Sequence, residues 1–416
     1  MWAIVVLAVV VRLAYAFFAV SPKLTDDETH FWRIAGNIAH GKGYSYLGEA
    51  TAWRPPVYTY ALAGLRWIGL GVRGVQVVQA VVGASVPLLL VLSARRLKVP
   101  EWAALLAGLA GALYPPFVHV ASQALSENAS IPLLLLAVWL TLVVLDAPRG
   151  AHPIAIATGA AWGLAILARP AALPALAVAA IVAVVARRPV AAATGVIVAA
   201  VVVAPWVVRD DRAVGGPLAV VSNESFTLWV SNRLDAEPLK DVFRDPNYPG
   251  LQDYGVYGRD FPGIERLAEE KGFDFDHASE YERDRWFRRL VVDDVKADPW
   301  RFVRRAAAKS VLALAPAPDN ASQQERTSPA AKVALWLTSG PLMVLGLAGL
   351  VVMAARAGPK GWFLAGSAVI SLVGLATHLP YVRYRVGSVD PFLILSAAWL
   401  VAAVLDGLAR RRSPAT

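Results

Sequence analysis

The feature that most constrains this chain is a series of apolar segments, each about as long as a membrane is thick. A helix needs about 20 mainly apolar residues to cross the hydrocarbon core of a bilayer. Because lipid offers no hydrogen-bond partners, a spanning segment must satisfy its backbone internally, which favours a helix. The sequence therefore predicts an all-α polytopic membrane protein of about ten transmembrane helices, at residues 1–20, 75–97, 102–121, 129–145, 153–168, 171–186, 190–208, 332–355, 362–379 and 391–408.

The overall composition agrees with this class. Hydrophobic residues make up 57% of the 416 residues and charged residues only 17%, whereas a soluble domain carries roughly a quarter charged residues. The net charge is +9, but the basic residues are scattered over loops, so nucleic acid is not an expected partner. The chain has no cysteine, which excludes disulfides and thiol catalysis.

The basic loops predict the orientation of the helices. If the N-terminus lies in the cytoplasm, the clusters at residues 95–98, 149, 187–188, 356–360 and 410–412 all face the cytoplasm, as the positive-inside rule requires. The segment 57–70 is apolar, but at about 14 residues it is too short to span and is expected to be interfacial or re-entrant. The richness in Ala, Val and Arg is typical of a GC-rich bacterial genome. We therefore predict a multi-pass protein of a bacterial plasma (inner) membrane, with both termini cytoplasmic and the loop at 21–74 extracytoplasmic.

This topology divides the chain into three parts. Residues 1–208 are expected to form a transmembrane module that includes a first outer loop at 21–74. Residues 209–331 form a polar extracytoplasmic insert, with a helix expected at 279–297 and an interfacial helix at 301–314. Residues 332–416 supply the C-terminal transmembrane helices.

The first outer loop contains a cluster of acidic residues directly after the first span. Asp26, Asp27 and Glu28 are followed closely by His30. A carboxylate at the membrane surface can serve as a general base or as a metal ligand. The same acids also suit the N-terminus of a helix at 28–39, where negative charge is stabilised. Both interpretations remain open, as does the choice between Asp26 and Asp27 as the base.

Other charged residues lie at the outer ends of the spans. Glu127 stands alone between two apolar segments, where a carboxylate needs water or a partner. Several arginines oppose the positive-inside trend, which indicates an anionic partner such as phosphate, or else snorkelling to lipid headgroups; they are Arg169, Arg209, Arg212, Arg383 and Arg385. Together these residues predict one outward cavity suited to transfer of a group from a phosphate-linked lipid.

The same residues resemble the pattern of a known family, the GT-C superfamily of membrane glycosyltransferases. The resemblance is to bacterial relatives of protein O-mannosyltransferases and of the lipid A aminoarabinose transferase. It rests on residues 27–35, Gly41-Lys42-Gly43-Tyr44 and Arg54-Pro55-Pro56-Val57-Tyr58, with weaker landmarks at Ser126-Glu127, Ala168-Arg169-Pro170, Pro205-Trp206, Asp298-Pro299 and Arg383-Tyr384-Arg385. The resemblance implies a module of seven helices, two juxtamembrane helices in the first outer loop, and a polyprenyl-phosphate-linked sugar as donor. Phe31 stands where the family commonly has Tyr, and His30 has no family role.

The resulting hypothesis is an inverting glycosyltransferase that moves a sugar from a polyprenyl-phosphate donor to an acceptor hydroxyl on the outer face. Asp27 and Glu127 are the expected catalytic residues. The expected substrate-binding residues are Glu28, His30, Tyr44, Arg54, Arg169, Tyr381, Arg383 and Arg385. A divalent metal at Asp27 and Glu127 is left open, and the expected partners are the donor, membrane lipids and an acceptor glycan, lipid or protein.

Two other functions compete with this hypothesis. A transporter or flippase of lipid-linked sugars would use charges at mid-membrane, of which Arg12 is the clearest, although Arg12 is also expected to pair with an outer-loop acid. A non-catalytic assembly or anchoring protein would use the insert as its binding part. The acids lie at the rim of the spans and no internal repeat is visible, so transfer is the favoured interpretation.

Overall fold

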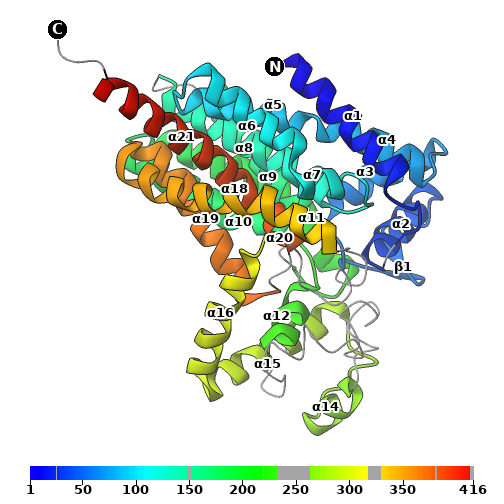
Figure 1. Ribbon diagram of the computed structural model, residues 1–416. Coiled ribbons are helices and arrows are strands. Elements are labelled where there is room, and N and C mark those ends of the chain that lie inside the picture. Colours follow the sequence, from blue (N-terminus) through cyan, green and yellow to red (C-terminus); the bar gives the residue numbers. More distant parts are fainter. Residues whose placement is uncertain are drawn as a thin grey trace.

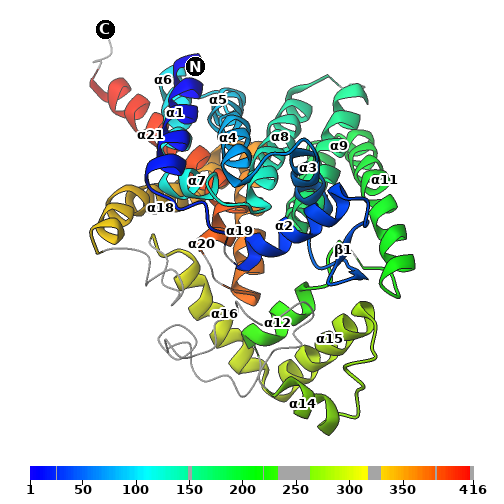
Figure 2. The ribbon, with the colours of Figure 1, turned by 90° about the vertical axis from the view of Figure 1, so that its right-hand side faces the viewer.

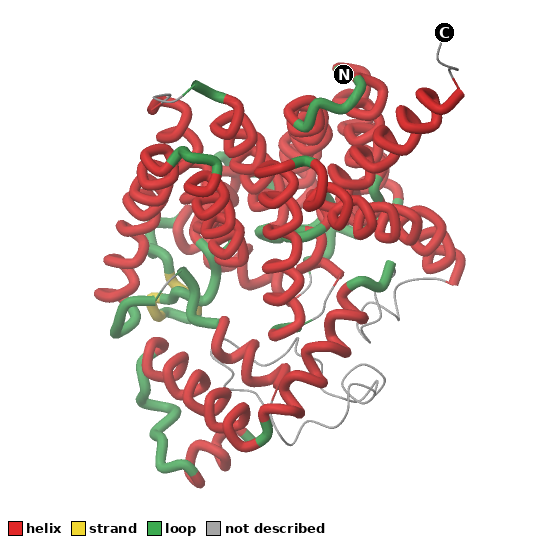
Figure 3. Tube along the Cα trace, turned by 90° about the vertical axis from the view of Figure 1, so that its left-hand side faces the viewer, coloured by secondary structure: helices red, strands yellow, loops and turns green. Residues whose placement is uncertain are grey.

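The computed structural model describes residues 1–24, 26–148, 152–218, 220–232, 263–316, 329–379 and 382–412. Most of this is helix (Figure 3). The strands in these ranges are β1 (Ser45–Tyr46) and β2 (Glu49–Ala50), which pair antiparallel in the first outer loop. The predicted all-α class is therefore confirmed.

Each of the ten predicted spans contains a helix. Within the described ranges, six apolar helical stretches have the length of a membrane span, and the apolar helices at 2–18, 101–113, 152–168 and 170–185 are shorter. The bundle consists of α1 (Trp2–Phe18), α4 (Val72–Gly83), α5 (Ser85–Arg96), α6 (Glu101–Leu113), α7 (Pro115–Val120), α8 (Glu127–Asp146), α9 (His152–Ala168), η1 (Pro170–Ala172), α10 (Leu173–Val185), α11 (Pro189–Ala213), α18 (Pro329–Arg356), α19 (Gly358–Thr377) and α21 (Asp390–Arg412).

Small residues allow these helices to pack closely. α9 lies against both α8 and α11, and α18 packs along α21. A methyl group on Gly159 in α9 would come within 2.5 Å of the Gly195 carbonyl oxygen in α11, so the two backbones touch there. Close approach at glycine is typical of helix pairs in membranes, where packing rather than water drives association. Both termini lie at the same end of the bundle (Figure 1).

Arg12 hydrogen-bonds to backbone carbonyls at the break between α6 and α7. α6 ends just before Pro115 and Pro116, which have no N–H group and so cannot donate to the carbonyls of Gly111 and Ala112 four residues earlier. Arg12 is 1% exposed and donates to both carbonyl oxygens, each at 3.2 Å. The expected pairing of Arg12 with an outer-loop acid is therefore wrong, because the C-terminal carbonyls of α6 are its partners.

We expect Arg12→Leu to lower the thermal stability of the protein. It would leave the Gly111 and Ala112 carbonyls buried without a donor, at about 1–3 kcal/mol each. Thermal unfolding followed by tryptophan fluorescence measures the effect. Adding Pro115→Ala and Pro116→Ala should recover part of the loss, because alanine restores the two N–H groups. An unchanged midpoint in Arg12→Leu would contradict this role.

The first outer loop contains the two juxtamembrane helices that the resemblance implies. α2 (Asp26–Ala39) and α3 (Pro56–Trp67) pack against each other, and they lie together beside β1 (Figure 2). Phe31 and Ala35 of α2 form a buried cluster with Tyr58 and Leu62 of α3. At 12 residues, α3 is too short to span a bilayer, as the sequence predicts.

The insert forms a helical lobe that lies away from both termini (Figure 1). It contains α12 (Glu224–Asn232), α14 (Ile264–Glu270), α15 (Glu280–Ala297) and α16 (Pro299–Ala313). α15 matches the predicted helix and begins with a capping box between Ser279 and Glu282. Asp298 caps α16 by accepting a hydrogen bond from the Arg301 N–H at 2.8 Å, which explains the Asp298-Pro299 landmark. The helices pack on aromatic side chains from α12 and α15, including Phe226, Trp229, Trp286 and Phe287.

A polar contact joins this lobe to the first outer loop. Glu280, the first residue of α15, accepts hydrogen bonds from the Ala52 N–H at 3.0 Å and from the Ser222 hydroxyl. Arg209, near the end of α11, donates to the carbonyls of Thr51 at 2.6 Å and Tyr44 at 2.9 Å. These bonds fix the backbone directly before Arg54. The insert therefore supports a loop that carries predicted site residues.

Candidate active site

Asp27 lies in the first turn of α2 and holds two arginines from distant parts of the chain. Its Oδ1 pairs with Arg54 Nη2, and its Oδ2 pairs with Arg383 Nη2. Arg54 directly precedes the two prolines that start α3, and Arg383 belongs to the short helix α20 (Val382–Val386). The first outer loop and the segment between α19 and α21 are thus brought together at one carboxylate.

The two arginines govern the charge state of Asp27. Burial by itself would raise the pKa of the Asp27 carboxyl. The attraction of Arg383 and Arg54, with their hydrogen bonds, outweighs burial and holds that pKa well below its usual range. Asp27 is therefore a carboxylate at every physiological pH.

A second ion pair lies beside the first. Glu127 is the first residue of α8, and its Oε1 is 2.6 Å from Nη1 of Arg169, which lies between α9 and η1. The Tyr384 ring connects the two pairs, because the Cζ atoms of Arg169 and Arg383 lie 4.7 and 4.9 Å from its centroid. Arg383 also donates to the Tyr384 hydroxyl at 3.1 Å. The sequence placed Tyr384 in an Arg-Tyr-Arg landmark, but this bridging role was missed.

We call these six residues, Asp27, Arg54, Glu127, Arg169, Arg383 and Tyr384, the carboxylate–arginine cluster. Its three guanidinium groups outnumber its two carboxylates, so it has a net positive charge of one. Such a site is suited to an anion, and arginine binds phosphate oxygens in a bidentate manner.

The same geometry does not favour a divalent cation. Both oxygens of Asp27 and one oxygen of Glu127 already face guanidinium groups. Among the residues that the structure describes, no three His, Asp or Glu side chains gather closely enough to hold a metal. A cation would have to displace several arginines, so the donor set does not fit it.

Three other predicted site residues support the cluster from outside. The Tyr44 hydroxyl donates to the Arg54 carbonyl oxygen at 2.7 Å, and Tyr44 is 6% exposed. Glu28 Oε1 accepts a hydrogen bond from the Ala124 N–H at 2.6 Å, just before α8. His30 Nδ1 lies 2.8 Å from Arg54 Nη2. These side chains hold the backbone or an arginine in place.

Of the two remaining predicted residues, Arg385 lies outside the cluster. Arg385 is fully buried, with its Nε 2.8 Å from Asp390 Oδ1, and it donates to the carbonyls of Ala313 and Ala315 at the end of α16. It joins the insert to α20 and α21 and does not face Asp27. Tyr381 lies outside the described residues.

A small pocket adjoins the Glu127–Arg169 pair. It lies between α8, α9, η1, α10, α19 and the turn that joins α20 to α21. Its polar lining includes Ser130, Arg169, Ser371 and Ser388. A methyl group on Gly387 would come within 3.4 Å of Arg169 Nη1. The glycine therefore leaves room beside the guanidinium.

Part of the sequence matches a known protein family. Residues 53–208 match the family described as dolichyl-phosphate-mannose-protein mannosyltransferase. No curated protein matches the sequence.

Solved structures extend the comparison to the whole chain. The apo oligosaccharyltransferase of Archaeoglobus fulgidus superposes with a TM-score of 0.57 at 16% identity, over 99% of this chain and 51% of that one. The same archaeal protein, AglB, in complex with an inhibitory peptide and a dolichol-phosphate, gives 0.56 at 15% identity, over 99% and 51%. ArnT from Cupriavidus metallidurans bound to undecaprenyl phosphate gives 0.46 at 18% identity, over 99% and 81%.

The present chain spans about half the length of the archaeal oligosaccharyltransferase that it matches. The family match covers the end of the first outer loop and the helices up to α11, and the structural match covers nearly the whole chain. Residues 53–208 are therefore similar to the dolichyl-phosphate-mannose-protein mannosyltransferase family, and the fold of the chain is similar to that of the archaeal oligosaccharyltransferase, in line with the predicted resemblance to the GT-C superfamily.

Proposed function

We propose that this protein is an inverting glycosyltransferase that moves a sugar from a polyprenyl-phosphate donor to an acceptor hydroxyl on the outer face of a bacterial plasma membrane. The observation that carries the proposal is the convergence of Asp27, Arg54 and Arg383 beside the Glu127–Arg169 pair. A carboxylate base and an excess of arginines in one place are what transfer from a phosphate-linked donor needs.

The donor class follows from the charge and location of the cluster. A net positive site at the end of apolar helices suits an anionic group carried on a lipid. The AglB relative is described in complex with a dolichol-phosphate, and the matching family is described as acting on dolichyl-phosphate-mannose. Both descriptions support a polyprenyl-phosphate donor, with a hexose or a pentose as the sugar.

In the proposed reaction Asp27 takes the proton of the acceptor hydroxyl as general base. The acceptor oxygen attacks the anomeric carbon from the face opposite the phosphate. The new carbon–oxygen bond forms as the bond to the phosphate oxygen breaks, and the lipid phosphate leaves with the electron pair. Arg54 and Arg383 stabilise the negative charge where it develops, and Glu127 orients the acceptor.

In this scheme, binding of the donor makes Asp27 a stronger base. In the present structure Asp27 holds both arginines, which makes its carboxylate a weak proton acceptor. A donor phosphate competes for the same guanidinium groups. As they turn to the phosphate, the pKa of Asp27 rises toward its ordinary value, and the carboxylate becomes a better base only when the donor is present.

The contacts of Arg12 remove the main argument for a transporter. Arg12 is committed to the carbonyls of Gly111 and Ala112, so it is not a free charge along a transport path. The contacts of this residue give it a structural role.

Reconstitution tests the proposal. Purified protein in liposomes is supplied with polyprenyl-phosphate sugars, radiolabelled in the sugar, and with cell-envelope glycan, lipid and protein fractions. We expect label to appear in one acceptor fraction, and to be absent with Asp27→Asn. Movement of the labelled donor across the bilayer without any transfer would contradict the proposal and support a flippase.

A further inference from the structure

Arg54 is held by two acceptors on one nitrogen. Its Nη2 pairs with Asp27 Oδ1 and lies 2.8 Å from His30 Nδ1. Asp27 and His30 are three residues apart on α2 and therefore share a helix face. The Arg54 guanidinium also lies over the Phe31 ring, with Cζ 5.2 Å from its centroid. Side chains of α2 thus contact both Nη2 and the planar face of the Arg54 guanidinium.

The contact fixes the protonation of the histidine. A guanidinium has only donors, so a ring nitrogen within hydrogen-bond distance of it must offer a lone pair. His30 Nδ1 is therefore unprotonated, and the ring is neutral with its hydrogen on Nε2. A second proton would place an imidazolium against a guanidinium.

The surroundings agree with a neutral ring. Burial and then Arg54 lower the pKa of His30 to about 4, with Asp27 opposing them and Arg33 adding to them. The His30 ring also stands edge-on to Tyr46, with the centroids 5.2 Å apart. His30 is therefore neutral between pH 5 and 8, as its contact with Arg54 requires.

The contacts with α2 leave one donor atom of Arg54, Nε, for a ligand. The Arg54 Nε atom is buried and makes no hydrogen bond to any residue that the structure describes. Since Nη2 is occupied by Asp27 and His30, Nε remains as a donor for an incoming phosphate oxygen. If Asp27 is released when the donor binds, His30 is the acceptor that still holds Nη2.

We propose that His30 is a positioning residue: as a neutral acceptor it fixes the Arg54 guanidinium, so that Arg54 can transfer its ion pair from Asp27 to the donor phosphate without rotating away. This inference rests on the proposed function, and it replaces the substrate-binding role expected from the sequence. It assigns a role to a residue that the family pattern leaves without one.

Three variants test the acceptor. His30→Asn places an amide oxygen where Nδ1 stands, His30→Gln carries its amide one bond further out, and His30→Leu has no acceptor. We expect His30→Leu to raise the KM for the donor about tenfold or more, the size typical of a hydrogen bond to a charged group. His30→Asn should stay within about threefold of the wild type, and His30→Gln should resemble His30→Leu. Equal losses in all three variants would overturn the proposal.

A double-mutant cycle tests whether His30 acts through Arg54. In an Arg54→Gln background, His30→Leu should cause no further change in kcat/KM, because the group that it positions is absent. Independent, additive losses would contradict the proposal. The pH–rate profiles of wild type and His30→Asn should coincide between pH 5 and 8, and loss of a limb in the variant would show that the histidine titrates during the reaction.

Nitrogen NMR of the histidines tests the same claim without turnover. The chain has six histidines, and the signal missing from His30→Asn identifies the ring of interest. We expect the Nε2–H tautomer, without titration from pH 5.5 to 8. A proton on Nδ1, or titration near the ordinary histidine pKa, would overturn the proposal. If the wild type transfers no sugar but gives this spectrum, only the proposed function fails.

Discussion

Replacing Asp27 by asparagine should abolish sugar transfer while leaving donor binding near normal. Asparagine has almost the same size as aspartate, but it cannot take the proton from the hydroxyl of the acceptor substrate. A general base contributes about 10²–10⁴-fold to the rate. Arg54 and Arg383 would lose their internal partner, so donor affinity should stay equal or increase. Transfer of labelled sugar and binding of the polyprenyl phosphate, measured on the same preparation, check the two parts of this prediction.

Asp26→Asn is the matched control for that experiment. It removes one negative charge from the adjacent position without touching either oxygen that pairs with Arg54 and Arg383. We expect it to retain most of the transfer activity. Full turnover in Asp27→Asn, or loss of turnover only in Asp26→Asn, would remove Asp27 from the mechanism.

Arg385→Met should destabilise the protein more than any other single change to an arginine of this segment. The change leaves Asp390, which is fully buried, with Tyr114 as its remaining hydrogen-bond donor among the described residues, at 2.8 Å. Breaking a buried ion pair by removing one partner costs about 3–5 kcal/mol. The midpoint of thermal unfolding should fall clearly, and the folded fraction should still bind the donor.

Two comparisons make that prediction specific. The pair Arg385→Met with Asp390→Leu should recover much of the stability, because it removes both charges together. Arg383→Gln, only two residues away, should leave the melting midpoint nearly unchanged and abolish most transfer, because Arg383 faces Asp27. A stable Arg385→Met protein without donor binding would place Arg385 in the substrate site instead.

The sequence predicts the helices well because the bilayer imposes their length. All ten apolar runs are helical, and the short run at 57–70 is the short helix α3. Local chemistry also fixes the insert helices, since the capping box at Ser279 and the Asp298 cap start α15 and α16. These signals lie within a few residues of the structures that they specify.

Which charges meet in space could not be predicted in the same way. Arg383 and Arg385 are two residues apart on α20, yet one pairs with Asp27 and the other with Asp390. Arg12 pairs with carbonyls that are freed by prolines about a hundred residues away. These partners depend on how distant helices pack, which periodicity and composition do not encode.

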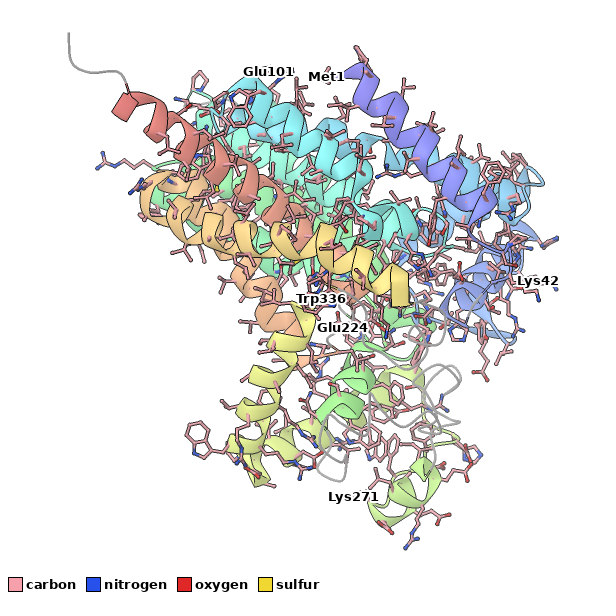
Figure 4. The ribbon with its side chains drawn as sticks, in the orientation of Figure 1. Met1, Lys42, Glu101, Glu224, Lys271 and Trp336 are labelled. Atoms are coloured by element: carbon pink, nitrogen blue, oxygen red, sulfur yellow. The ribbon has the colours of Figure 1, made fainter. Side chains whose placement is uncertain are left out.

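The proposed reaction requires the first outer loop to lie on the extracytoplasmic side of the membrane. Figure 4 shows Met1 and Glu101 at one end of the molecule, Lys271 in the lobe away from them, and Lys42 beside the first-loop helices. The cysteine-free chain allows single cysteines to be introduced at Lys42 and, as the control on the opposite side, at Lys98. A membrane-impermeant maleimide added to intact cells should label Lys42→Cys and should label Lys98→Cys only after the membrane is opened. Labelling of Lys98→Cys alone in intact cells would contradict an extracytoplasmic active site.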